Sequence, residues 1–230
     1  MVRQRIVQHE HPGTALESIL LLPEGKGPYP AVLLFHEYTG LNSVTIGHAK
    51  RLAETGYAVL AADFYGLENR PVSIAEARAT HRIYRNDRLL MRERAEACFE
   101  ILCNQPEIDL FNIYVLGFSF GGGAALELTR TGVFLKGSAS VYGYLDTSHP
   151  VVSRDVKCPL LVIHVDNDPV VPAEHLAMFE DEMQSAGVDY DLIRLDNATH
   201  GFANPEDDGF DVRLAEDMWD TVLRWFDILK

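Results

Sequence analysis

The chain has 230 residues, of which 47% are hydrophobic and 23% are charged, and its formal net charge is −14. These values fit one soluble globular domain over residues 1–230. The negative charge argues against nucleic acid or an anionic membrane as the main partner. No apolar run approaches the roughly 18 residues of a membrane span, and no apolar leader follows Met1. The three cysteines (Cys98, Cys103 and Cys158) lack a metal-binding spacing and favour a reduced, cytoplasmic location.

Strand-like apolar runs alternate with helix-like stretches along the chain. The expected strands are 14–22, 29–35, 57–62, 113–118, 134–142, 159–165 and 190–195. The expected helices are 43–55, 88–104, 121–131, 173–186 and 214–229, and 67–87 is a long mixed segment. This alternation predicts an α/β fold, with a mainly parallel, doubly wound sheet and helices on both faces. The segment 143–158 is too short to hold a separate cap domain.

One motif joins the strand expected at 113–118 to the helix that follows it. The sequence Gly117-Phe118-Ser119-Phe120-Gly121 is Gly-x-Ser-x-Gly, which is typical of the nucleophile elbow of α/β-hydrolases. A nucleophilic hydroxyl must stand clear of the backbone, so its residue occupies a sharp turn whose neighbours approach too closely for a Cβ atom. The simpler interpretation is a glycine-rich turn with a buried serine.

Two further polar residues follow later strands in the order that the same chemistry requires. Asp168 comes just after the strand expected at 159–165, and His200 follows the last strand. The order Ser119, Asp168, His200 is that of an α/β-hydrolase triad, and ligands bind at this edge of an open sheet. Asp166 competes for the role of the acid, but Asp168 lies farther past the strand and opens an Asp-Pro turn. We expect no metal at His164 and the two aspartates, because alternating strand residues commonly just share a face.

Four stretches together resemble the dienelactone hydrolase family. They are His36-Glu37-Tyr38-Thr39-Gly40-Leu41-Asn42, Gly117 to Gly122, Asp168-Pro169-Val170-Val171-Pro172 and His200-Gly201-Phe202-Ala203. The resemblance implies the α/β-hydrolase fold, a catalytic triad and no cofactor. It also implies an oxyanion hole made by the backbone N–H groups of Tyr38 and Phe120. Finally, it implies a pocket carboxylate, Glu37, that contacts the nucleophile.

The chain departs from the family pattern at two positions. The name-giving enzymes have a cysteine nucleophile, whereas this chain has Ser119. A serine hydroxyl is too weak an acid for Glu37 to ionise it, so we expect His200 to act as the base. Glu37 would then hydrogen-bond within the oxyanion loop or shape the pocket. Asn204 stands where dienelactone-specific members have an arginine that binds the substrate carboxylate. An asparagine cannot form the two charge-assisted hydrogen bonds that an arginine makes with a carboxylate. This difference argues against dienelactone as the substrate.

A second family arginine maps to Arg82 when the chain is counted forward from Asp63 without gaps. The surrounding segment is rich in arginine: Arg70, Arg78, Arg82, Arg85, Arg88, Arg92 and Arg94. In one interpretation Arg82 lines the pocket mouth and favours an anionic substrate. In the other, the arginines form a solvated helix face that is paired with local acids, namely Glu76, Asp87, Glu93 and Glu96.

The sequence therefore predicts a serine hydrolase of small carboxylic esters or lactones, some of them anionic, that works through an acyl-enzyme. A peptidase or a thioesterase with the same triad stays open as an alternative. A non-catalytic α/β-hydrolase-fold binding protein is a third possibility, although such proteins usually lack a triad member. The expected partner is a small molecule.

Overall fold

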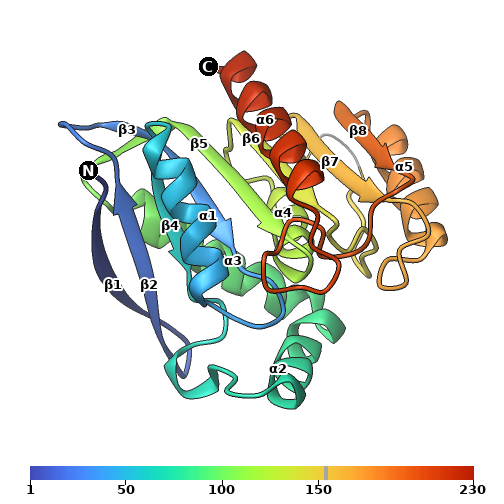
Figure 1. Ribbon diagram of the computed structural model, residues 1–230, viewed down its shortest axis with the longest axis horizontal. Helices are drawn as coiled ribbons and strands as arrows, with labels where there is room; N and C mark the ends of the chain where they lie inside the picture. The colour runs from blue at the N-terminus through green and yellow to red at the C-terminus, as the bar shows by residue number, and fades with distance from the viewer. Residues whose placement is uncertain (153–154) are drawn as a thin grey trace.

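The computed structural model describes residues 1–152 and 155–230, which form an α/β fold around one eight-stranded sheet (Figure 1). The strand order is β1-β2-β4-β3-β5-β6-β7-β8. The strands are β1 (Arg3–His11), β2 (Thr14–Leu22), β3 (Tyr29–Phe35), β4 (Ala58–Ala62), β5 (Ile108–Phe118), β6 (Gly137–Val141), β7 (Leu160–Val165) and β8 (Tyr190–Leu195). The helices are α1 (Ser43–Glu54), α2 (Ile74–Asn86), α3 (Arg88–Cys103), α4 (Phe120–Arg130), α5 (Ala173–Ala186) and α6 (Val212–Leu229), with a 3₁₀ turn η1 (Leu67–Asn69).

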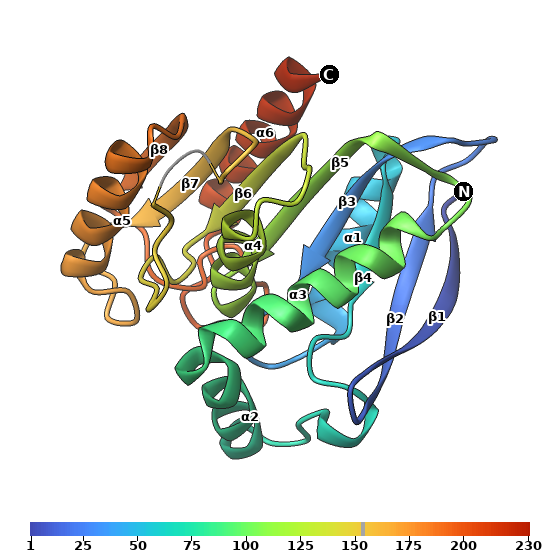
Figure 2. The same ribbon diagram turned by 180° about the vertical axis from the view of Figure 1, so that it is seen from behind.

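The sheet is mainly parallel, as the alternation of strands and helices predicts. Strands β3 to β8 pair in parallel, whereas β1 pairs antiparallel with β2, and β2 pairs antiparallel with β4. Helices α1 and α6 cover one face, and α3, α4 and α5 cover the other, as the two opposite views show (Figures 1 and 2). The predicted doubly wound α/β-hydrolase fold is therefore confirmed. Between β6 and β7, the described residues form no helix or strand that could build a cap.

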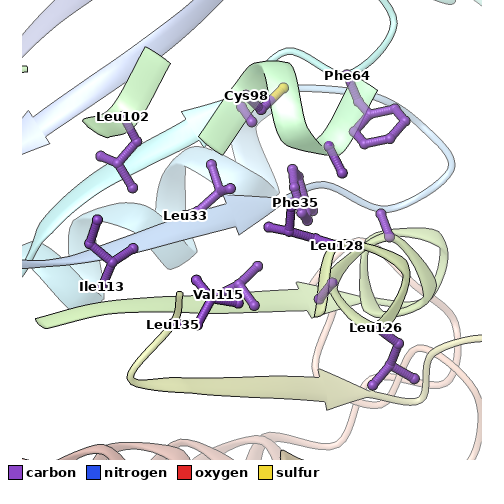
Figure 3. Close-up of a cluster of buried hydrophobic side chains, with 14 of the residues drawn as sticks. Leu33, Phe35, Phe64, Cys98, Leu102, Ile113, Val115, Leu126, Leu128 and Leu135 are labelled. Atoms are coloured by element: carbon purple, nitrogen blue, oxygen red, sulfur yellow. The ribbon is translucent and has the colours of Figure 1, made fainter. Parts of the chain in front are cut away.

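The core is divided by the sheet into two layers because successive side chains of a strand point to opposite faces. Leu33 and Phe35 of β3 pack with Val115 and Leu128 on the side of α3 and α4 (Figure 3). The intervening residue Leu34 belongs to the other layer, under α1 and α6. Both faces of β3 are covered, and this explains why its sequence is a continuous apolar run.

Two elements were not expected from the sequence. Strand β1 reads Arg-Gln-Arg-Ile-Val-Gln-His-Glu-His, and its one buried residue is His9, so its apolar signal is weak. It nevertheless pairs along its length with β2. Helix α2 lies in the segment 67–87 and buries only Ala77 and Tyr84. A usable signal was present there, because the Ser73 hydroxyl accepts from the N–H of Glu76 in a Ser-x-x-Glu arrangement typical of a helix start. In addition, β5 begins at Ile108, earlier than the predicted residue 113, and β6 begins at Gly137, later than the predicted residue 134.

Within the described part of the chain, no helix is long and apolar enough to span a bilayer. The three cysteines are free thiols. The described residues also contain no cluster of three His, Cys, Asp or Glu side chains suited to a metal ion.

Candidate active site

Ser119 occupies a strained turn between β5 and α4. Its φ of 51° is unusual for a residue other than glycine, and it precedes the first residue of α4. A Cβ on Gly117 would collide with the backbone of Gly121, and a Cβ on Gly121 would collide with the carbonyl groups of Phe35 and His36. The two glycines thus let strand, turn and helix approach closely enough to hold the Ser119 hydroxyl at the carboxyl edge of the sheet.

The structure brings Ser119, His200 and Asp168 into one hydrogen-bonded chain. Ser119 Oγ lies 2.8 Å from His200 Nε2, and His200 Nδ1 lies 2.7 Å from Asp168 Oδ2. The carboxylate accepts the Nδ1 proton, which leaves Nε2 free to accept the proton of the hydroxyl. Asp168 is itself fixed, because its Oδ1 accepts from the N–H groups of Val170 and Val171 at 2.7 and 3.3 Å.

The backbone N–H groups of Tyr38 and Phe120 are free to bind a ligand. Neither has a hydrogen-bond partner among the described residues. Phe120 is the first residue of α4, where N–H groups lack an intrahelical acceptor and the helix dipole favours negative charge. Tyr38 follows β3, and its carbonyl accepts from the Tyr65 hydroxyl at 3.0 Å. Both predicted oxyanion-hole residues therefore carry the donors that this role requires.

A buried histidine holds the loop that carries Tyr38. His36 Nδ1 donates to the Glu37 carbonyl at 2.6 Å, and its Nε2 accepts from the Phe64 N–H at 3.3 Å. Burial lowers the pKa of His36, so the ring stays neutral, as its acceptor role demands. The bond from Phe64 ties the loop after β3 to the segment after β4, and the bond to Glu37 fixes the ring within its own loop.

Glu37 is buried beside the loop of His200, but it forms no hydrogen bond with Ser119. Its Oε1 accepts from the Tyr142 hydroxyl and its Oε2 from Asn204 Nδ2, both at 2.8 Å. Burial raises the pKa of Glu37, and the hydrogen bonds from Tyr142 and Asn204 oppose that rise. The Glu37 carboxylate thus bonds residues outside the loop after β3 and not within it. Asn204 is 8% exposed, and its side-chain amide donates to this internal contact.

Arg82 lies on the exposed side of α2, next to a residue that faces the site. The His81 ring is 5.9 Å from the Tyr38 ring and 6.3 Å from the Phe120 ring, measured between centroids. Arg82 is exposed and forms no ion pair with any described residue. Helix α2 therefore flanks Tyr38 and Phe120 through His81, whereas Arg82 is exposed on the same helix.

Four of the other arginines, Arg70, Arg85, Arg88 and Arg92, pair with acids that lie outside the arginine-rich segment. Arg70 bonds Asp63 at 3.0 Å, and Arg85 bonds Asp146 at 2.7 Å. Glu127 accepts from Arg92 at 2.7 Å and lies 3.8 Å from Arg88. The expected pairing with Glu76, Asp87, Glu93 and Glu96 is therefore wrong for these four arginines. Arg85, Arg88 and Arg92 instead join α2 and α3 to the rest of the molecule.

Comparisons with known proteins agree with this architecture. The model of the dienelactone hydrolase family matches residues 16–229. A putative carboxymethylenebutenolidase of Yersinia pestis is 24% identical, and the match covers 93% of this chain and 84% of that protein. A probable 2-oxo-3-(5-oxofuran-2-ylidene)propanoate lactonase of a Bradyrhizobium species is 26% identical, covering 93% and 90%. The crystal structure of a dienelactone hydrolase-like promiscuous phosphotriesterase from metagenomic libraries superposes with a TM-score of 0.92 at 32% identity, covering 99% and 98% of the two chains.

Proposed function

This chain belongs to the dienelactone hydrolase family, and we propose that it is a serine hydrolase of small carboxylic esters or lactones. The observation that carries the proposal is the continuous hydrogen-bonded chain from Ser119 through His200 to Asp168, at 2.8 and 2.7 Å. Such a chain lets a neutral imidazole remove a proton from an alcohol that is otherwise a poor nucleophile.

In the proposed reaction, Ser119 Oγ attacks the carbonyl carbon while its proton passes to His200 Nε2. The oxyanion that forms accepts hydrogen bonds from the N–H groups of Tyr38 and Phe120. His200 then gives the proton to the leaving alkoxide oxygen as the bond from carbon to that oxygen breaks, which leaves an acyl ester on Ser119. Water, deprotonated by His200, attacks the acyl carbon, and Ser119 leaves with the proton as the acid is released. Asp168 orients the ring and stabilises its cationic form throughout.

The substrate we infer is a small ester or lactone, because the described chain between β6 and β7 builds no cap over the site. A peptidase or thioesterase would use the same three side chains, so the substrate panel below includes both bond types. Arg82 supports acceptance of anionic substrates through its exposed positive charge on α2. The free cysteines support a cytoplasmic location, with residues 1–230 acting as one domain on a small-molecule substrate. The negative net charge supports the view that neither nucleic acid nor a membrane is a partner.

The proposal is tested by turnover and by covalent labelling. We expect wild-type protein to hydrolyse p-nitrophenyl esters or lactones faster than thioesters or peptide anilides, and to be labelled by a fluorophosphonate. Ser119→Ala should lose both properties. A matched control exists at the surface, where Ser148 Oγ lies 2.9 Å from His149 Nδ1. Ser148→Ala should keep both properties, because that pair is exposed and, among the described residues, no carboxylate bonds the His149 ring as Asp168 bonds His200.

Three results would contradict the proposal. Wild-type protein that is neither labelled nor active on the whole panel would instead favour a non-catalytic binding protein. Labelling that persists in Ser119→Ala would place the nucleophile elsewhere. Turnover confined to thioesters or anilides would replace the ester by one of the alternative substrates.

A further inference from the structure

Glu37 joins three segments that are far apart in the sequence. It follows β3, Tyr142 follows β6, and Asn204 follows β8, with separations of 105 and 167 residues along the chain. The side chain of Glu37 is buried, and each of its oxygens accepts one bond of 2.8 Å. A buried carboxylate with both oxygens satisfied is held in one orientation and holds its partners in return.

Both partners of Glu37 act on the segment that carries His200. The Tyr142 ring packs edge-on against the His200 ring with 5.1 Å between centroids. Tyr142 has a φ of 38°, a strained value for a tyrosine that the surrounding contacts must maintain. Asn204 closes the turn directly after His200, since its N–H donates to the Gly201 carbonyl at 2.8 Å. The contact with Tyr142 therefore fixes the ring that packs against His200. The contact with Asn204 fixes the loop that carries His200.

We propose that Glu37 is a positioning residue, which holds the His200 imidazole against Ser119 through Tyr142 and Asn204. This inference rests on the proposed function, because it assigns no separate reaction to Glu37. It differs from the role that the family resemblance implies, in which the carboxylate contacts the nucleophile. Here the hydroxyl of Ser119 is already hydrogen-bonded to His200, and Glu37 holds Tyr142 and Asn204, the residues that position the His200 ring.

The ionised form of Glu37 suits this role better than the neutral form. A carboxylate accepts from the Tyr142 hydroxyl and from the Asn204 amide at once, whereas a proton on the oxygen that faces the Asn204 NH2 group would set a donor against a donor. Burial raises the pKa of Glu37, the bonds from Tyr142 and Asn204 and the nearby His200 lower it, and Asp207 raises it. The same negative charge favours the cationic state that His200 adopts after taking the proton of Ser119.

The test compares variants that alter the support but leave the three reacting side chains in place. We expect Glu37→Gln to lower kcat about 10- to 100-fold, the cost of a small misplacement of a catalytic group, with KM changed less than about twofold. Tyr142→Phe removes one oxygen and keeps the ring, and it should lower kcat in the same direction. The double variant should lose less than the product of the two single losses, because both act through one contact.

Two controls separate positioning from a general structural role. Glu182 is a buried carboxylate outside the site that accepts from Arg130 and from the Val151 N–H. Glu182→Gln should lower the melting temperature but leave kcat within about twofold of wild type. In a His200→Ala background, Glu37→Gln should have no further effect on the residual rate, since the ring that it positions is gone.

The inference is overturned if Glu37→Gln and Tyr142→Phe both keep wild-type kcat in protein that hydrolyses esters. It is also overturned if Glu37→Gln costs as much without His200 as with it, because Glu37 would then act on the nucleophile or on the fold. If Glu37→Gln does not fold, Tyr142→Phe decides alone. A wild-type protein that is inactive on the whole panel would instead contradict the proposed function, so the two failures are distinguishable.

Discussion

His200 Nδ1 lies 2.7 Å from Asp168 Oδ2, while Asp166, two residues earlier, bonds Arg194 at 2.9 Å near the surface. The backbone conformation explains why His200 bonds Asp168 and not Asp166. The N–H of Asp166 still donates to the Leu195 carbonyl of the neighbouring strand, whereas Asn167 adopts a left-handed φ of 60°. This turn carries Asp168 off the sheet and aims its carboxylate at the imidazole.

The two aspartates should therefore respond very differently to loss of charge. We expect Asp168→Asn to lower kcat/KM by roughly 10³- to 10⁴-fold, because the amide no longer selects the reactive tautomer of His200. Asp166→Asn should change kcat/KM less than about threefold, since it removes only a pair with a largely exposed arginine. Steady-state hydrolysis of one p-nitrophenyl ester measures both, and equal losses would contradict the assignment.

The charge of Arg82 should affect substrates according to their own charge. We expect Arg82→Ala to lower kcat/KM about threefold for esters that carry a carboxylate, and to leave neutral esters unchanged. Salt should weaken the difference, because exposed charges are screened. Arg78→Ala is the matched control, since it removes an exposed arginine one turn earlier on the same helix. Unchanged kcat/KM for both ester classes would rule out Arg82 at the pocket mouth.

The buried ion cluster around Glu127 should matter for stability. Glu127 is 1% exposed, bonds Arg92 at 2.7 Å and Arg130 at 3.2 Å, and lies near Arg88. We expect Glu127→Gln to lower the free energy of unfolding by about 3 kcal/mol, because Arg92 would lose its carboxylate partner, while Arg88 and Arg130 would each keep one, Asp146 and Glu182. Urea denaturation measures this value.

The comparison for Glu127 is an ion pair at the surface. Glu216 pairs with Arg51, and the Glu216 side chain is 56% exposed. Glu216→Gln should lower the free energy of unfolding far less than Glu127→Gln does, since solvent screens such pairs. If the two variants were equally stable, the cluster would not contribute through its burial.

His48 should make the fold sensitive to acid. Its ring stacks on Phe118 with 4.5 Å between centroids, and burial, with a smaller effect from Arg51, lowers its pKa from 6.5 to about 4. Between these values the unfolded chain binds a proton that the folded chain does not. Stability therefore falls as pH drops from about 6.5 towards 4. By pH 5 the loss due to this one ring should be about 2 kcal/mol.

The variant His48→Phe isolates that contribution while keeping an aromatic ring against Phe118. We expect its free energy of unfolding to fall about 2 kcal/mol less than that of wild type between pH 7.5 and pH 5. Urea titrations at the two pH values give the difference. Identical pH dependence of the two proteins would show that His48 protonates equally well in the folded state.

The sequence alone was sufficient for features that depend on neighbouring residues. The continuous apolar run at 29–35 indicated a strand buried on both faces, and Gly117 and Gly121 around Ser119 indicated a tight turn from strand to helix. Strand β1 and helix α2 were not predicted, because few of their residues are buried and their apolar periodicity is therefore weak. The catalytic roles of Ser119, Asp168 and His200 remain predictions for the variants above.

Only the tertiary structure decided which distant side chains meet. The sequence did not indicate that Glu37 accepts from Tyr142 and Asn204, or that Arg85 bonds Asp146. Local signals such as apolar periodicity and turn glycines are written in adjacent residues, and they act before the chain is compact. A hydrogen bond between residues more than a hundred positions apart depends on how the strands order themselves and how the helices pack, and no short stretch of sequence contains that information.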